Sequence, residues 1–148
     1  MVKSNSTEHC LLMSGPIKAL TIRQPWAWAI FNAGKYVENR SRPTKHRGPL
    51  AIHVSRRFVT GEILDSAACM RTTMGPSDIE MTVAMLKNQL GCIIGIVDVV
   101  DCVCDSASPW AIPGQWHWVL RNPRRVRPVP IVGRLGLFDY TAELEMIP

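Results

Sequence analysis

Residues Leu20–Ser55 read LTIRQPWAWAIFNAGKYVENRSRPTKHRGPLAIHVS and carry most of the polar chemistry of the chain. Pro25 has no N–H for a strand ladder but suits the first turn of a helix, and Gly34 suits a left-handed helix end. These signals predict four elements: a strand over Ile17–Ile22, a helix over Pro25–Ala33, and strands over Lys35–Arg40 and Pro49–Ser55. Polar side chains then meet where short elements end, which predicts a pocket.

The remaining chain predicts further short strands and helices. Hydrophobic spacing and turn residues place helices over Gly61–Met70 and Asp78–Leu90, and strands over Cys92–Cys104, Gln115–Leu120 and Gly133–Tyr140. Gly95 is a candidate β-bulge, and the Pro-rich segment 122–130, NPRRVRPVP, is typical of a sheet edge or corner. Because the elements do not alternate regularly, we expect an α+β fold, a small curled β-barrel of five or six strands flanked by two or three helices.

Composition indicates one domain with a basic surface. The chain has 148 residues, of which 47% are hydrophobic, so we expect a single domain over residues 16–148 after a polar, mobile tail over residues 1–15. Lys and Arg number 17 against 12 Asp and Glu, which permits an anionic partner. Two segments are rich in basic residues: Arg40–Arg57 and Arg121–Arg127. They form one positive surface if they face the same way, and separate solvated loops if they do not.

The cysteines and the apolar segments of the chain indicate its cellular compartment and whether it holds a metal ion or a cofactor. Five cysteines without framework spacing, and no signal segment, indicate a reducing cytoplasmic setting without structural disulfides. Cys92, Cys102 and Cys104 could approach one another, but no histidine lies near them in sequence, so we expect buried small hydrophobes and no metal. No apolar run is long enough for a membrane span, and no phosphate loop or dinucleotide fingerprint is present, so we expect no membrane association and no cofactor.

The motifs LTIRQPWAWAIFNAGKYVENRS, RGPLAIHVS, GQWHWVLRNP and VGRLGLFDY resemble the activating-signal-cointegrator homology (ASCH) family of the PUA-like superfamily. The resemblance covers Ile17–Tyr140. It implies a small β-barrel with a cleft beside the first helix, used across the superfamily for RNA, modified bases or nucleosides. Some ASCH proteins resemble hydrolases of N4-acylated cytidine, and others have been described as ribonucleases or as nucleic-acid-binding parts of coactivators.

Arg23 and Gln24 are the first candidates for ligand binding. They lie where a strand ends and a helix begins, and free backbone N–H groups there favour an anion. Arg23 offers a guanidinium fork to phosphate, and the Gln24 amide can contact a base edge. The alternative is structural: Gln24 caps the helix and Arg23 pairs with Glu38.

Tryptophans are candidates for base stacking. Trp26 lies on the predicted core-facing stripe of its helix, whereas Trp28 points elsewhere and is a candidate stacking surface. Trp116 and Trp118 alternate with His117 on a strand, so both indoles share a face, and Trp118 is the stronger candidate. The alternative for each is core packing.

Lys35 and Glu38 are the catalytic candidates. In the hydrolase branch that the chain resembles, a lysine after the first helix is followed three positions later by a threonine nucleophile; Lys35 matches the lysine, but Glu38 stands in the threonine's place. A carboxylate can act as a general base toward water, and a lysine can stabilise an oxyanion. Residues three apart on a regular strand face opposite sides, so convergence needs a strand end or bulge. The alternative is that Glu38 bridges to Arg40 or Arg23.

Two further residues complete the expected site. His53 lies on an apolar strand next to the Lys35 strand and could reach the same cleft, although a hydrogen-bonded core histidine is the alternative. Arg40 is expected to contact ligand. The function that we expect is binding of RNA, other single-stranded nucleic acid or a modified nucleoside through a basic cleft. Alternatives are an amidohydrolase of N4-acylated cytidine-like nucleosides, a ribonuclease, or a protein-interaction module without a ligand.

Overall fold

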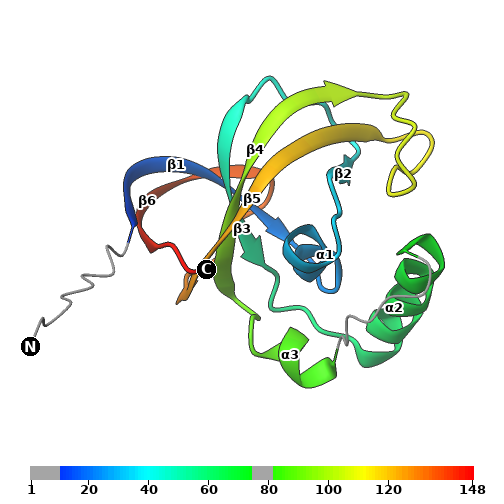
Figure 1. The fold of residues 1–148 in the computed structure, drawn as a ribbon, viewed down its shortest axis with the longest axis horizontal. Coiled ribbons are helices and arrows are strands. Elements are labelled where there is room, and N and C mark those ends of the chain that lie inside the picture. Colours follow the sequence, from blue (N-terminus) through cyan, green and yellow to red (C-terminus); the bar gives the residue numbers. More distant parts are fainter. Residues whose placement is uncertain (1–10, 75–81) are drawn as a thin grey trace, which may run out of the picture.

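The computed structural model describes residues 11–74 and 82–148. Within these ranges six strands form one sheet, and three helices accompany it (Figure 1). The strands are β1 (Leu12–Ile22), β2 (Val37–Arg40), β3 (Gly48–Val54), β4 (Cys92–Val103), β5 (Trp116–Pro130) and β6 (Leu137–Glu145). The helices are α1 (Trp26–Asn32), α2 (Thr60–Met74) and α3 (Val83–Lys87). The predicted α+β class is confirmed.

The order of the strands brings the ends of β1 and β3 together. The sheet has the order β2-β5-β4-β3-β1-β6. β1 and β3 are parallel neighbours, with Ile22 opposite Val54, and the other neighbouring pairs are antiparallel. Parallel strands end at the same edge of a sheet, so the segments that follow β1 and β3 leave the sheet side by side. The candidate site lies at this edge.

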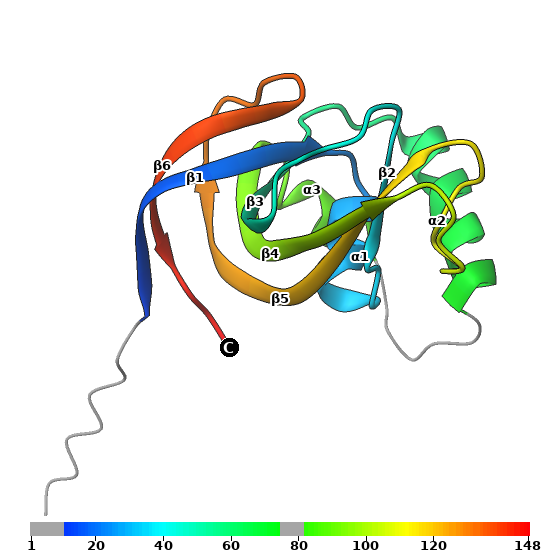
Figure 2. The ribbon, with the colours of Figure 1, turned by 90° about the horizontal axis from the view of Figure 1, so that it is seen from above.

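The barrel part of the prediction is not confirmed. The sheet bends strongly along β4 and β5 (Figure 2), but β2 and β6 are its two edge strands. Closure of a barrel needs a continuous ladder between the edges. β2 has only four residues and pairs with β5 alone. At the other edge, the residues after β6 meet β5 through one isolated bridge, Val126 with Met146, and through a hydrogen bond from Ile147 N to the carbonyl oxygen of Arg125. The architecture is therefore a curved six-stranded sheet with helices beside it.

Two strands are much longer than the sequence predicted, and β6 is shifted, since it runs over Leu137–Glu145 and not over the expected Gly133–Tyr140. β1 begins at Leu12 rather than Ile17, and its first residues pair with the end of β6, from Leu12 opposite Glu145 onward. The Pro-rich segment 122–130 was expected to form an edge or corner, yet it continues β5 to Pro130. Its pairing with β4 is irregular, with three register shifts, and Asn122 has a positive φ of 54°. Such irregularity accommodates prolines, which cannot donate to a ladder.

Gly95 confirms the predicted bulge and explains how α1 meets the sheet. The β4–β5 register shifts between Ile93 and Gly95. A Cβ at Gly95 would collide with the Phe31 ring and would lie 2.7 Å from the carbonyl oxygen of Arg124. The missing side chain therefore lets Phe31, at the end of α1, pack directly on β4. This packing fixes α1 beside the edge at which β1 and β3 end.

The helices α2 and α3 lie on the same side of the molecule as α1, away from β6 (Figure 1). α2 extends the helix expected over Gly61–Met70 at both ends. α3 is shorter than the expected Asp78–Leu90 helix; part of that prediction falls on residues 75–81, outside the described residues. Thr82 caps α3 by accepting a hydrogen bond from Met85 N. None of the helices in residues 11–74 and 82–148 is long and apolar enough to cross a membrane.

Candidate functional site

A cavity of about 860 Å³ opens at the edge where β1 and β3 end. Its walls come from the end of β1, α1, β2, the end of β3 with the residues after it, and the loop 131–136 between β5 and β6. Five arginines line it: Arg23, Arg40, Arg56, Arg57 and Arg134. The carboxylate in the lining is that of Glu38. We call this cavity the basic pocket.

The turn between β1 and α1 separates Arg23 from Gln24. Arg23 is exposed and faces the basic pocket, and its carbonyl oxygen accepts the N–H groups of Trp26 and Ala27, which starts the helix. Gln24 is 2% exposed and lies outside the lining of the basic pocket. Arg23 therefore faces the basic pocket, as predicted, whereas Gln24 lines a smaller neighbouring cavity of about 270 Å³.

The Gln24 amide connects α1 to α3. Its oxygen accepts the N–H of Trp28 at 3.0 Å, and its nitrogen donates to the carbonyl oxygen of Leu86 at 3.2 Å and to Gln89 Oε1 at 2.8 Å. These contacts match the helix-capping alternative for Gln24. Both ends of the amide have protein partners, so its contribution is to hold the turn that carries Arg23.

Lys35 and Glu38 meet in a buried ion pair at the wall of the basic pocket. Lys35 is 4% exposed, and its Nζ donates to the carbonyl oxygen of Val37 at 2.6 Å and to Glu38 Oε2 at 2.9 Å. Convergence is possible because β2 begins only at Val37, so Lys35 lies before the strand, where strand alternation does not apply. Lys35 does not line the basic pocket, but Glu38 does.

Glu38 stands between two cations. Its Oε1 lies 3.7 Å from Arg40 Nη1, while Oε2 binds Lys35. No ion pair joins Glu38 to Arg23 in the part of the chain that the structure describes. The charge of Glu38 is therefore already balanced from within the protein. It orients Arg40 toward the basic pocket without making the pocket acidic.

His53 lines the basic pocket and holds the loop 131–136, which forms one of its walls. It is 2% exposed, and its Nε2 lies 3.0 Å from the carbonyl oxygen of Ile131. Because a carbonyl oxygen can only accept, Nε2 carries the proton, and in the neutral ring Nδ1 accepts the Thr21 hydroxyl at 3.0 Å. A Cβ at Gly133 would lie 2.6 Å from His53 Cε1. His53 thus packs against the backbone of the loop 131–136 and holds it at the pocket.

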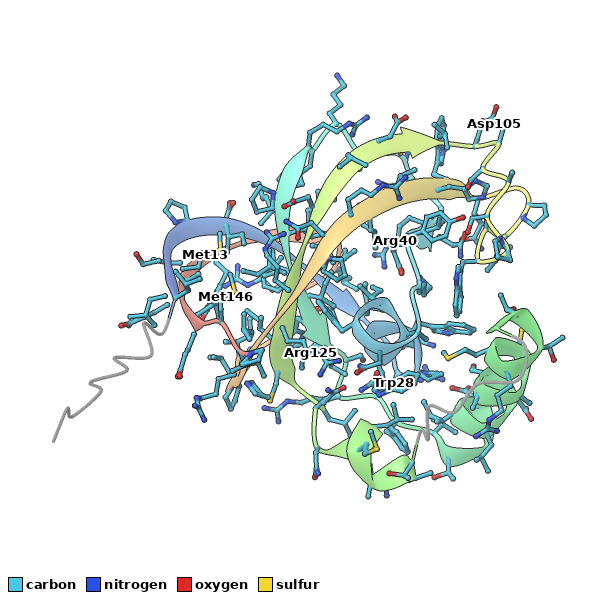
Figure 3. The ribbon with its side chains drawn as sticks, viewed as in Figure 1. Met13, Trp28, Arg40, Asp105, Arg125 and Met146 are labelled. Carbon is cyan, nitrogen blue, oxygen red and sulfur yellow. The ribbon has the colours of Figure 1, made fainter. Side chains whose placement is uncertain are left out.

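The two tryptophans of α1 have exchanged the positions that the helix stripe predicted. Trp28 is 2% exposed and packs with Ile63 and Met70 of α2, on the far side of α1 from Arg40 (Figure 3). Trp26 is only partly buried and lines the basic pocket. The stripe failed because α1 is covered on two sides, by the sheet and by α2, so burial does not follow one face.

Trp118 lies in the core beneath Arg40. It is 4% exposed, its Nε1 donates to the carbonyl oxygen of Arg42 at 3.0 Å, and the Arg40 guanidinium lies 5.9 Å from the centre of its ring. Trp118 does not line the basic pocket. Its visible contribution is a cation–π contact that supports Arg40.

A family model for the ASCH domain matches residues 20–130. The chain belongs to the ASCH domain family. "Activating signal cointegrator 1" of Mus musculus is 35% identical over 134 residues, and the protein of the same name from Homo sapiens is 34% identical over 134 residues. Each alignment covers 84% of this chain and 22% of the relative, so the chain spans about a fifth of the length of these relatives. The resemblance stated from the motifs is thus confirmed.

The two arginine-rich segments of this ASCH domain do not line one cavity. Arg40, Arg56 and Arg57 of the first segment border the basic pocket, whereas Arg124 and Arg125 of the second border a different cavity of about 750 Å³. That second cavity is largely apolar and lies near the two ends of the described chain, where Met13 and Met146 are found (Figure 3). The basic surface at the first helix therefore depends on the first segment.

Sequence reasoning missed two contributors to the basic pocket. Arg134 comes from the loop 131–136, beyond the matched residues 20–130; it lies in the motif VGRLGLFDY, whose pattern predicts a strand from Gly133 and not a loop at the pocket. Its position depends on the hydrogen bond from Ile131 N to the carbonyl oxygen of Gly91, which joins the loop to the start of β4. Trp26 was assigned to the core. Its position could not be predicted from α1 alone, because both the sheet and α2 cover this helix.

The cysteines of the ASCH domain give no indication of a metal centre. No group of three potential ligands from His, Cys, Asp and Glu comes together within residues 11–74 and 82–148. Cys69, Cys92, Cys102 and Cys104 are free. Burial raises the pKa of the Cys92 thiol, and the nearby Arg56 partly offsets this effect.

Proposed function

We propose that this ASCH domain binds RNA, or a nucleotide carrying a modified base, in the basic pocket. The observation that carries the proposal is the convergence of five arginines from four separate segments on one cavity of about 860 Å³. That volume lies within the range of small-molecule sites, roughly 300 to 1,000 Å³. The cavity is open and not filled by the protein's own side chains, which argues against an interaction module without a ligand.

The free guanidinium groups have the chemistry of a phosphate site. Arg23, Arg56 and Arg134 are exposed and take part in no ion pair with another described residue. Guanidinium forks match phosphate oxygens in pairs, and they bind better when no carboxylate competes. Trp26 adds an aromatic surface on which a base can stack. Phosphate and base thus each have a partner in one cavity, and the ligand class that the ASCH resemblance implies is the same.

Binding of a short single-stranded RNA, followed by fluorescence anisotropy, tests the proposal. If three arginines contact phosphates, the slope of log affinity against log salt is about −2, so affinity falls about 20-fold between 50 and 200 mM salt. Arg23→Ala is expected to weaken binding about tenfold and to make the slope shallower. The matched control is Arg42→Ala, which removes the same charge from an exposed residue outside the pocket lining.

Two results would overturn this function. One is the absence of binding at low salt to both RNA and nucleotides. The other is an equal loss of affinity in Arg23→Ala and Arg42→Ala, because equal losses would mean that only net charge matters and that the basic pocket is not the site.

The second candidate is a small amidohydrolase of N4-acylated cytidine-like nucleosides, and the observation in its favour is the Lys35–Glu38 ion pair at the pocket wall. In this reaction Glu38 would accept a proton from water as water attacks the amide carbonyl, and would return that proton to the N4 amine as the C–N4 bond breaks, giving cytidine and the free carboxylic acid. Incubation with N4-acetylcytidine and measurement of free cytidine tests it, with Glu38→Gln as the variant. Turnover that is unchanged in both Glu38→Ala and Lys35→Ala would remove these residues from the reaction.

A further inference from the structure

A smaller cavity adjoins the basic pocket on the side of α2. It has a volume of about 270 Å³, and we call it the side cavity. Three residues line both cavities: Arg23, Trp26 and Arg57. Side chains that line two cavities form the wall between them. The basic pocket and the side cavity are therefore neighbouring compartments that meet at two guanidinium groups and one indole.

The side cavity differs from the basic pocket in charge. Glu62 lines it, and Arg57 Nη2 lies 3.2 Å from Glu62 Oε1. A carboxylate repels a phosphate group, so an anion is disfavoured inside this compartment. Its remaining wall consists of the apolar Val59 and Ile63, the hydroxyl of Ser66 and the amide of Gln24, which is bonded within the protein at both ends. An uncharged flat ring with polar edges fits this lining, and the small volume suits a ring better than a whole nucleotide.

The common wall is positively charged, because Arg23 has no ion pair with another described residue and Arg57 is the one of the two that is paired with Glu62. Arg23 and Arg57 are both exposed, and they stand where a connection between the two compartments must pass. Trp26 is partly buried beside them and offers an aromatic surface. In a nucleic-acid strand, an anionic phosphodiester joins each nucleoside to the next, and each nucleoside carries an uncharged base that can stack on an aromatic side chain. The two arginines, Trp26 and the side cavity match these three properties.

We propose that the ligand of this site is a strand of at least two nucleotides. One nucleotide occupies the basic pocket, the phosphodiester lies at Arg23 and Arg57, and the base of the neighbouring nucleotide enters the side cavity against Trp26. This inference rests on the proposed nucleotide-binding function and specifies the length of the ligand.

Calorimetric titration with two matched probes tests the length of the site. The first probe is the 5′-phosphorylated dinucleotide of cytidine, and the second has the same backbone and charge but lacks the second base. Stacking of one base contributes enough for the complete dinucleotide to bind about tenfold more tightly than the abasic probe. Because both probes carry the same phosphates, the ratio of their affinities is independent of the general attraction of the basic pocket.

Variants that fill the side cavity locate the second base. Val59→Glu and Ser66→Glu each put a longer, hydrated side chain into the side cavity, which leaves less room for a ring, and Leu64→Glu puts the same side chain at an exposed position of α2 outside both linings. The tenfold ratio is expected to fall to about one in Val59→Glu and Ser66→Glu and to persist in Leu64→Glu. Thermal denaturation identifies any variant that has lost its fold, and the other side-cavity variant then decides.

The outcomes distinguish this inference from the function on which it rests. Equal affinity of the wild-type protein for both probes overturns the two-nucleotide site but leaves nucleotide binding intact. A ratio that survives in both side-cavity variants also overturns it, because the second base then lies elsewhere. Failure of both probes and of a longer single-stranded RNA to bind at low salt overturns the proposed function itself.

Discussion

Removing one partner of the Lys35–Glu38 pair is expected to destabilise the fold strongly. In Lys35→Met, Glu38 loses the ammonium that lies 2.9 Å from its Oε2 and keeps only Arg40 at 3.7 Å. The two side chains of the pair are 3% and 10% exposed, so water cannot replace the lost partner well. Breaking a buried pair from one side typically costs about 3–5 kcal/mol. Arg40 remains near Glu38, so we expect about 3 kcal/mol.

Urea denaturation followed by tryptophan fluorescence measures this loss, which corresponds to a decrease in Tm of roughly 6–12 °C for a domain of this size. The double variant Lys35→Met with Glu38→Leu removes both charges, so it is expected to be less destabilised than the sum of the two single variants. A single variant within about 0.5 kcal/mol of wild type would refute the argument. So would strict additivity, because it would mean that the two groups do not interact.

Three further predictions concern the loop 131–136 at the pocket and the buried thiol of Cys92. Gly133→Ala places a methyl group 2.6 Å from His53 Cε1, so the loop 131–136 must move outward. We expect the RNA affinity to fall and the hydrogen exchange of the loop amides to become faster. An unchanged exchange rate would contradict the packing of His53 against the loop. Cys92 should react with a thiol reagent at pH 8 more slowly than the exposed Cys69, because burial raises the pKa of the Cys92 thiol, an effect only partly offset by Arg56. The native state then holds the thiol proton of Cys92 more tightly than the unfolded state, so the free energy of unfolding should fall as the pH rises above 9.0, the ordinary pKa of the thiol. This fall should be less steep in Cys92→Ala. Equal dependence of the unfolding free energy on pH in the two proteins would argue against the raised pKa.

Local chemistry allowed the elements around the site to be predicted. The end of the first strand at Ile22 and the start of β4 at Cys92 match the structure, because Pro25 and Gly91 interrupt the backbone pattern at those points. The bulge at Gly95 could be predicted for the same reason, since glycine inside an apolar strand marks irregular pairing. Each of these signals acts within a few residues of the feature that it predicts.

The lining of the basic pocket could not be predicted in the same way, because it depends on contacts distant in sequence. Arg134 reaches the pocket only because Ile131 bonds to Gly91 and to His53. Trp28 is buried because α2 covers it, and α2 begins at Thr60, 28 residues after the end of α1 at Asn32. A periodicity argument confined to α1 contains no information about that cover. Sequence reasoning therefore brought Arg23, Glu38, Arg40 and His53 to one cavity, as expected, but did not give the direction of each side chain.

The arrangement of polar residues explains why the role of each residue in the segment 20–55 is difficult to read from the sequence. Buried polar residues lie directly behind residues that line the basic pocket: Gln24 is buried behind exposed Arg23, and Lys35 is paired with Glu38, which is also buried but reaches the pocket wall. A buried polar group must be hydrogen-bonded, so Gln24 and Lys35 carry as strict a requirement for residue type as any group that touches a ligand. Amino-acid type alone therefore cannot separate support from recognition. The distinction requires exposure: Arg23, Arg56, Arg57 and Arg134 are exposed at the basic pocket, whereas Gln24, Lys35 and His53 are buried and bonded within the protein.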